Sequence, residues 1–143
     1  IMWAATMALN GLIGVGVKTD WATHVIGHEL TALHGLDHAI TLAIVLPGLL
    51  DKMKEHRSVK LIQYAERIWG LSGSDEEKIN QAITKTDAFF RSLGAKTLLN
   101  EHKVGTETIE KIVGRFETRK MAKLGMQQDV SLENVKEILE SRL

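Results

Sequence analysis

The stretch that decides the fold runs from Trp21 to Pro47 and reads WATHVIGHELTALHGLDHAITLAIVLP. Four of the six histidines of the chain fall within it: His24, His28, His34 and His38. They form two pairs with a spacing of four, and Gly35 stands between the pairs. Residues four apart lie on one face of a helix, so each pair can present two imidazole rings in one direction. Since imidazole is a common ligand for zinc and iron, a metal site is one reading of this pattern.

The spacing alone leaves a second reading open, because a single histidine on an apolar face is usually a hydrogen-bonded core residue. Geometry limits the metal reading further. On an unbroken helix His24 and His38 would lie about 21 Å apart, which ligation at about 2.0–2.1 Å cannot bridge. If the two share an ion, the chain must turn near Gly35 so that two helices converge.

Two known metal-binding patterns do not fit the cluster. Glu29 follows His28, which gives H-x-x-x-H-E, whereas zinc proteases of the H-E-x-x-H type carry the Glu between the two ligands. The Glu-x-x-His pairs of di-iron carboxylate bundles are absent from the stretch. A site made of two histidines would also lack ligands, since catalytic zinc usually has three from the protein. His56 and His102 lie in charged segments and are expected at the surface.

At 143 residues, the chain has the length of one globular domain, covering residues 1–143. Charge is balanced at 18 basic and 18 acidic residues, which gives no reason to expect a nucleic-acid partner or a membrane partner. The absence of cysteine excludes disulfides, thiolate metal sites and a cysteine nucleophile. It also suits a reducing compartment, so a cytoplasmic location is expected.

Hydrophobic residues dominate the first third of the chain. Its first fifty residues contain only four charged side chains: Lys18, Asp20, Glu29 and Asp37. We therefore expect this part to be interior, with a core helix from Ile1 to about Ile13 that has no polar face. The run is too short and too broken by glycine and Asn10 to span a membrane. Because it starts without Met or a helix cap, we expect a fragment whose N-terminal portion is absent.

The periodicity predicts an all-α fold of about seven helices, with no alternating run long enough for a strand. Thr19 or Asp20 is expected to cap the second helix, and Pro47 to kink or end the third. Ile68 and Phe89 are among the side chains expected to be buried. After Ile13 the predicted helices run from Asp20 to Gly35, Asp37 to about Lys54, Ser58 to Trp69, Ser74 to about Leu93, Thr106 to about Lys123, and Ser131 to about Leu143.

The longer stretch DWATHVIGHELTALHGLDHAITLAIVLPGLL resembles the signature of the iron-containing (group III) alcohol dehydrogenases. The family pattern is a His, a second His four residues on, a third fourteen after the first, and an apolar helix reaching Leu-Pro. His24, His28, His38 and Leu46-Pro47 match it. The flanking MWAATMALNGLIG and KLIQYAERIWG resemble the butanol dehydrogenase and aldehyde reductase branch, so the likeness covers most of the chain.

The resemblance implies a two-domain subunit in which this chain is the C-terminal helical, metal-binding domain. The missing partner would be an N-terminal Rossmann-like domain that binds NADP(H) or NAD(H). The metal, Fe²⁺ or Zn²⁺, would be held by an upstream Asp and His together with His24 and His38. The resemblance places His28 beside the nicotinamide, as a catalytic and cofactor-binding residue that relays a proton or positions the ring. His34 has no general family counterpart and is expected to be structural or to lie behind the ligands.

The implied reaction interconverts a small alcohol and an aldehyde. The metal acts as a Lewis acid on the substrate oxygen, and hydride passes between the substrate carbon and the nicotinamide. Asp37 either orients a ligand imidazole or caps a helix. The family also suggests a homodimer. With half the ligands and the nucleotide site absent, we expect no activity from this chain alone.

Two other function classes compete with the dehydrogenase. The first is a non-catalytic helical bundle that binds a metal through His24, His28, His34 and His38 together. The second is a purely structural bundle with no metal dependence. The first predicts about equal loss of metal on replacing any of the four histidines, whereas the dehydrogenase hypothesis makes His34 dispensable.

Overall fold

A computed structural model describes all 143 residues, and it confirms the all-α fold with seven α-helices. The one addition is a two-residue antiparallel ladder in which Leu124 pairs with Val130. So short a ladder leaves no alternating pattern in a sequence. The elements are α1 (Met2–Leu9), η1 (Leu12–Gly14), α2 (Ala22–His34), α3 (His38–Lys52), α4 (Ser58–Trp69), α5 (Asp75–Ser92), η2 (Asn100–His102), α6 (Thr106–Thr118), β1 (Lys123–Leu124), β2 (Val130–Ser131) and α7 (Leu132–Glu140). None of the helices is both long and apolar enough to cross a membrane.

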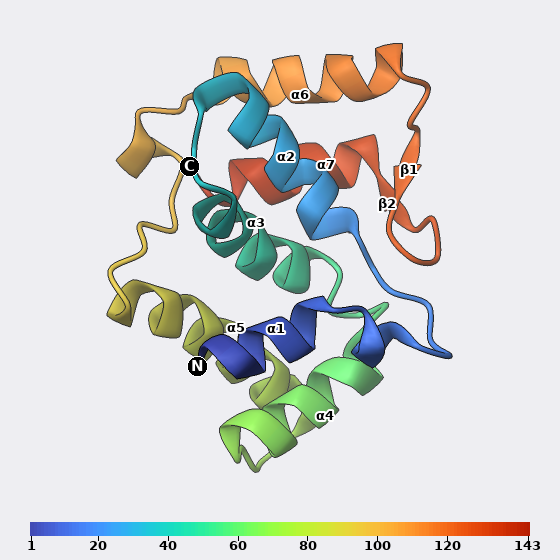
Figure 1. Cartoon of the computed structure of the whole chain (residues 1–143), viewed down its shortest axis with the longest axis vertical. Coiled ribbons are helices and arrows are strands. Elements are labelled where there is room, and N and C mark those ends of the chain that lie inside the picture. Colours follow the sequence, from blue (N-terminus) through green and yellow to red (C-terminus); the bar gives the residue numbers. More distant parts are fainter.

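Four helices enclose the main core. α2 and α3 pack against α6 and α7, while α4 and α5 pack on each other below them and α5 also contacts α3 (Figure 1). Apolar side chains at helical spacing supply this core from each helix, as amphipathic helices do. Its largest fully buried members are Ile26, Leu30, Ile44, Leu49, Met53, Leu99, Ile109, Ile112, Phe116, Ile138 and Leu139. A smaller cluster of Leu61, Ile79 and Ile83 joins α4 to α5.

Glycine ends α2 as the sequence predicted. Gly35 adopts a left-handed conformation with φ 66°, and its N–H donates to the Thr31 carbonyl. A residue without Cβ takes this conformation without strain, which is why glycine commonly follows a helix C-terminus. The chain turns there, and three residues later His38 begins α3. The turn that an ion shared by His24 and His38 would require is therefore present.

The predicted helix caps are partly confirmed. Asp20 accepts a hydrogen bond from the Ala22 N–H at 2.9 Å, whereas Asp37 stands at the N-cap of α3 without a side-chain bond. Ser74 and Glu77 form a capping box at the start of α5: the Ser74 Oγ accepts from the Glu77 N–H, and the Glu77 carboxylate accepts from the Ser74 N–H. These bonds from Ser74 to the charged form lower the pKa of Glu77.

Pro47 does not end α3, which runs without interruption from His38 to Lys52. The prediction that Pro47 ends the helix was therefore wrong, while the alternative of a kink stays a prediction. Proline removes one backbone donor from the helix. On either side of it, Val45 and Leu49 are almost completely buried in the main core. Burial of these side chains offsets the lost hydrogen bond, so the packing keeps the segment helical.

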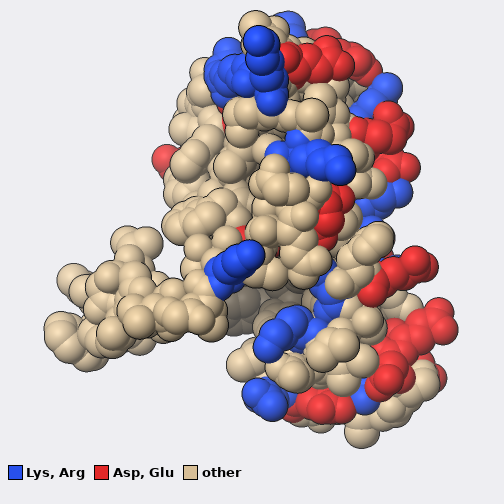
Figure 2. All heavy atoms as spheres, turned by 90° about the vertical axis from the view of Figure 1, so that its right-hand side faces the viewer, with Lys and Arg blue, Asp and Glu red and all other residues tan.

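The expected burial of the N-terminal helix was wrong. α1 is only eight residues long and contains no buried residue. Trp3 is 76% exposed and Leu9 86% exposed. The N-terminal segment, which has no charged side chain before Lys18, projects from the body of the molecule as an arm (Figure 2). Apolar composition indicates a tendency to be covered, but no other segment of this chain covers α1.

Two further side chains expected inside are exposed. Ile68 on α4 is 66% exposed and Phe89 on α5 is 48% exposed. Both helices pack along a narrow seam in which only Leu61, Ala65, Ile79, Ala82 and Ile83 are buried apolar residues. The apolar stripe that the sequence shows is wider than this seam.

Candidate metal and nicotinamide site

The turn at Gly35 brings three of the four clustered histidines together. His24 and His28 come from α2, and His38 comes from the first residue of α3. The ring centroids of His24 and His38 lie 5.1 Å apart, and those of His28 and His38 lie 4.7 Å apart. The His24 and His28 centroids are 6.3 Å apart. Residues fourteen apart in the sequence therefore meet, which an unbroken helix would not permit.

This group of rings lies at the surface, contrary to the expected interior position. His24 is half-buried, while His28 and His38 are exposed. The opposite face of α2 carries Ile26 and Leu30, which are fully buried in the main core. The helix is thus anchored on its apolar face and presents the imidazoles outward. A ligand or a further protein segment can reach them directly.

Burial lowers the pKa of His24, and the neighbouring imidazoles of His38 and His28 lower it further. The neutral form of His24 is therefore favoured at neutral pH. A neutral imidazole is the form that binds a metal ion. The ring of Trp21 packs edge-on against His24, with centroids 4.9 Å apart, and restricts its orientation.

His34 takes no part in the group. It lies on the last turn of α2, and its Nε2 is 2.9 Å from the Thr108 hydroxyl of α6. It therefore links two helices at a different place from the other three rings. This position weighs against a site built equally from all four clustered histidines. His56 is exposed, as expected, whereas His102 is half-buried and bonds to the Lys96 carbonyl.

The geometry fits a shared ion in part. Two imidazoles bound at about 2.0–2.1 Å to one tetrahedral metal have ring centroids about 5 Å apart, which matches the His24–His38 separation of 5.1 Å. Ring separation alone does not distinguish His24 from His28 as the partner of His38. No three His, Asp or Glu side chains of this chain are arranged to hold a metal ion. A complete set of three or four ligands would thus need residues from outside this chain.

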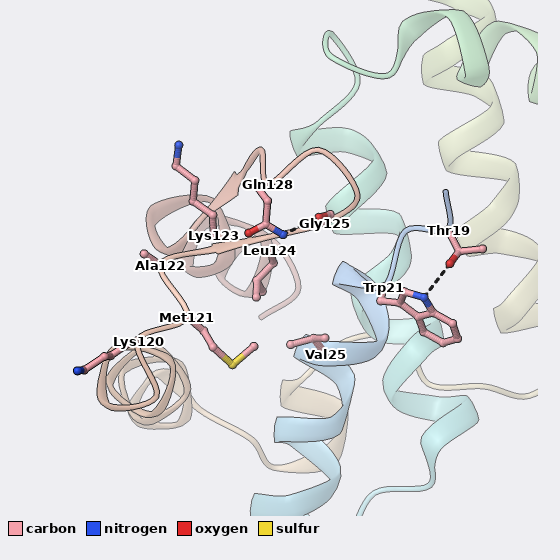
Figure 3. Close-up of a pocket in the computed structure, with 10 residues that line it drawn as sticks. All are labelled: Thr19, Trp21, Val25, Lys120, Met121, Ala122, Lys123, Leu124, Gly125 and Gln128. Atoms are coloured by element: carbon pink, nitrogen blue, oxygen red, sulfur yellow. Dashed lines mark hydrogen bonds between the residues drawn. The ribbon is translucent and has the colours of Figure 1, made fainter. Parts of the chain in front are cut away.

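A cavity of about 680 Å³ opens at the start of α2 (Figure 3). Trp21 and Val25 line it from the start of α2. The Trp21 indole donates to the Thr19 hydroxyl at 2.8 Å. The facing wall comes from the segment that follows α6 and from the β1–β2 hairpin, with Met121 and Leu124 among its residues. Because Trp21 contacts both the cavity and His24, the two features adjoin.

Two charged networks escaped the sequence reasoning. Glu29, next to His28, has a side chain only 6% exposed and is ion-paired to Arg115 of α6 and to Arg119 at the C-cap of that helix. A lone carboxylate in an apolar segment signals a buried partner, and that signal was available in the sequence. Arg57 also pairs with Asp20 at 2.8 Å, which ties the start of α2 to the α3–α4 corner. No pattern in the sequence points to this second pair.

The whole chain, residues 1–143, matches the model of the Fe-containing alcohol dehydrogenase family, C-terminal part. The NADPH-dependent aldehyde reductase YqhD of Escherichia coli is 49% identical over 142 residues, which is 99% of this chain and 37% of that protein. The NADP-dependent alcohol dehydrogenase 3 of Entamoeba histolytica is 43% identical over 80% of this chain and 29% of its own length.

Solved structures agree with these matches. The crystal structure of E. coli YqhD superposes on this chain with a TM-score of 0.95. The match covers 99% of this chain and 37% of the YqhD chain. The NADH-dependent butanol dehydrogenase A of Thermotoga maritima superposes with a TM-score of 0.89 at 32% identity, over 98% of this chain and 37% of the other. The chain thus spans 37% of the length of YqhD and of the Thermotoga maritima enzyme, and 29% of the Entamoeba histolytica enzyme.

Proposed function

Since the chain belongs to the Fe-containing alcohol dehydrogenase family, we propose that it is the helical, metal-binding part of an NAD(P)(H)-dependent alcohol dehydrogenase or aldehyde reductase. The observation that carries the proposal is the meeting of His24 and His38, fourteen residues apart, at a ring separation of 5.1 Å. The rest of the subunit would be an N-terminal nucleotide-binding domain, which the relatives' greater length supports. A homodimer stays a prediction.

We infer that His24 and His38 are two of the metal ligands. The neutral form of His24, favoured by burial, suits ligation. The surface position of the group suits completion by an Asp and a His from an adjoining segment. When bound, Fe²⁺ or Zn²⁺ supplies a Lewis acid for the substrate oxygen. The nicotinamide supplies the hydride chemistry.

We infer that His28 acts on the cofactor side of the site. It is exposed, and its ring centroid lies 4.7 Å from that of His38, so it stands beside a ligand while remaining accessible. An imidazole can both accept and donate a proton, which suits proton relay or hydrogen bonding to the nicotinamide. The adjoining cavity at Trp21 and Leu124 offers room for a small alcohol or aldehyde.

The test replaces each histidine in the full-length enzyme and measures bound metal together with NADPH-dependent reduction of butanal. His24→Ala and His38→Ala are expected to lose metal and activity together. His28→Ala should keep the metal but reduce butanal more slowly. His34→Ala should keep both metal and activity, because the His34 ring contacts Thr108 and not the other histidines. Equal loss of metal in all four variants would instead favour the non-catalytic bundle that uses every histidine.

The isolated chain provides a second test. Because no complete ligand set lies within it, residues 1–143 with NADPH, added Zn²⁺ or Fe²⁺ and butanal are expected to show no oxidation of the nicotinamide. The full-length enzyme under the same conditions is the control. Turnover by the isolated chain would refute the proposal that the site is shared with a further segment.

A further inference from the structure

Helices α2 and α3 approach closely at Gly27. A Cβ added there would lie 2.9 Å from the Thr41 hydroxyl oxygen, 3.4 Å from the Thr41 Cβ and 3.5 Å from a methyl of Leu42. Gly27 lies inside α2 and its backbone is helical, so the conformation itself does not demand glycine. Glycine in a helix interior is less favourable than alanine. The close contact with α3 accounts for its presence.

Thr41 cannot easily move out of the way. It is completely buried, and its hydroxyl donates to the His38 carbonyl at 2.9 Å. In a helix a threonine side chain has only two common χ1 rotamers, and the bond to the His38 carbonyl favours the one observed here. A methyl group at position 27 must therefore push α2 and α3 apart, from a contact of 2.9 Å towards the ordinary 3.4 Å.

The contact lies one helical turn from both candidate ligands, because Gly27 follows His24 by three residues and Thr41 follows His38 by three. The geometry points to Gly27 as the positioning residue that sets the spacing between His24 and His38. The inference rests on the proposed function in one respect: the spacing matters because the two rings are to bind one ion. At a metal site, shifts of the ligand side chains by well below 1 Å matter, because binding depends on the distances and angles at which the ligands are held.

The chain offers matched controls among its own helical glycines. A Cβ at Gly48 would meet α7, at 3.0 Å from the Ile138 carbonyl oxygen, far along α3 from His38. Gly48→Ala should thus cost stability without altering the rings. Gly114 on α6 has nothing within 4 Å of an added Cβ, so Gly114→Ala should melt at or above the wild-type temperature. The double variant Gly27→Ala/Thr41→Ala removes the contact with the Thr41 hydroxyl, the one below 3.4 Å, and should restore the spacing of the two helices.

The spacing is measured in residues 1–143 by crystal structures or by ring-to-ring nuclear Overhauser effects, and Zn²⁺ affinity is measured in the full-length enzyme by chelator competition. Gly27→Ala is expected to lengthen the 5.1 Å separation by about 0.5 Å and to weaken Zn²⁺ binding about fivefold or more. The double variant should restore both within about twofold. Gly48→Ala should change neither, whatever it does to the melting temperature.

An unchanged ring separation in Gly27→Ala, or an equal change in Gly48→Ala, would overturn the inference. Where Gly27→Ala alone does not fold, the double variant decides. A His24–His38 separation in it that departs from wild type by more than 0.5 Å counts against the inference, and one that matches counts for it. If the separations change as expected while the full-length wild-type enzyme binds no Zn²⁺ through these histidines, the proposed function fails and the spacing role of Gly27 stands.

Discussion

Replacing Glu29 by glutamine tests what holds the histidine helix against α6. The Glu29 side chain is 6% exposed, and its two oxygens accept from Arg115 and Arg119, whose side chains are 39% and 46% exposed. A glutamine amide can accept from one arginine but turns an N–H₂ group towards the other. One charge-assisted hydrogen bond is then lost and the remaining one is weakened.

The cost is below that of a fully buried pair. Breaking a buried ion pair costs about 3–5 kcal/mol when a charge is left buried and unpaired, but here both arginines can turn to water. A hydrogen bond to a charged group contributes about 1.5–3 kcal/mol, so we expect a loss of about 2 kcal/mol in the free energy of unfolding. At about 2–4 °C per kcal/mol for a chain near this size, the Tm should fall by about 4–8 °C.

The assay is thermal unfolding of residues 1–143, followed by circular dichroism at 222 nm. Glu110→Gln is the matched control, because Glu110 on α6 pairs with Lys136 on α7 and is 67% exposed. That change should cost less than about 0.5 kcal/mol. A Glu29→Gln chain that melts within 2 °C of Glu110→Gln would show that the buried carboxylate adds nothing to stability, and would refute the reasoning.

Three further perturbations have defined outcomes. The pKa of Glu101 is lowered to about 2, chiefly by its hydrogen bond from Arg91. A lowered carboxyl pKa stabilises the fold above the ordinary value near 4.5 and loses that effect as pH falls towards 2. The stability gap between wild type and Glu101→Gln in urea titrations should therefore be present at pH 6 and close by pH 2. A gap that is constant with pH would contradict this. Ser74→Ala removes the cap of α5 and should cost about 1 kcal/mol in urea unfolding, whereas no change would mean that α5 is fixed by packing alone. Leu30→Ala in the main core should cost about 2–5 kcal/mol, and a loss below 1 kcal/mol would contradict its place in that core.

The positions of the helices could be predicted from the sequence better than the burial of individual side chains. Helix bounds follow from local signals such as the glycine at position 35 and the cap at Ser74, which act within one turn. Burial depends on what surrounds a helix, and apolar α1 is exposed because this chain supplies no cover for it. The continuity of α3 through Pro47 was likewise decided by tertiary packing, which a local rule does not contain.

The candidate site shows the same division. If His24 and His38 share one ion, their spacing requires a turn near Gly35, because an unbroken helix would hold the two rings too far apart. The surface exposure of the rings, the edge contact of Trp21 and the ion pairs of Glu29 depend on how α2 is rotated against α6. That rotation results from the summed packing of the core and has no local signature.

The central claim is that His24 and His38 share one metal in the full-length enzyme. The most direct measurement is a crystal structure of that enzyme loaded with metal, in which anomalous scattering locates the ion. The account predicts an ion about 2.0–2.2 Å from a ring nitrogen of His24 and of His38, with His28 and His34 outside this distance. An ion ligated by His28 in place of His24, by all four histidines, or by neither His24 nor His38 would contradict it.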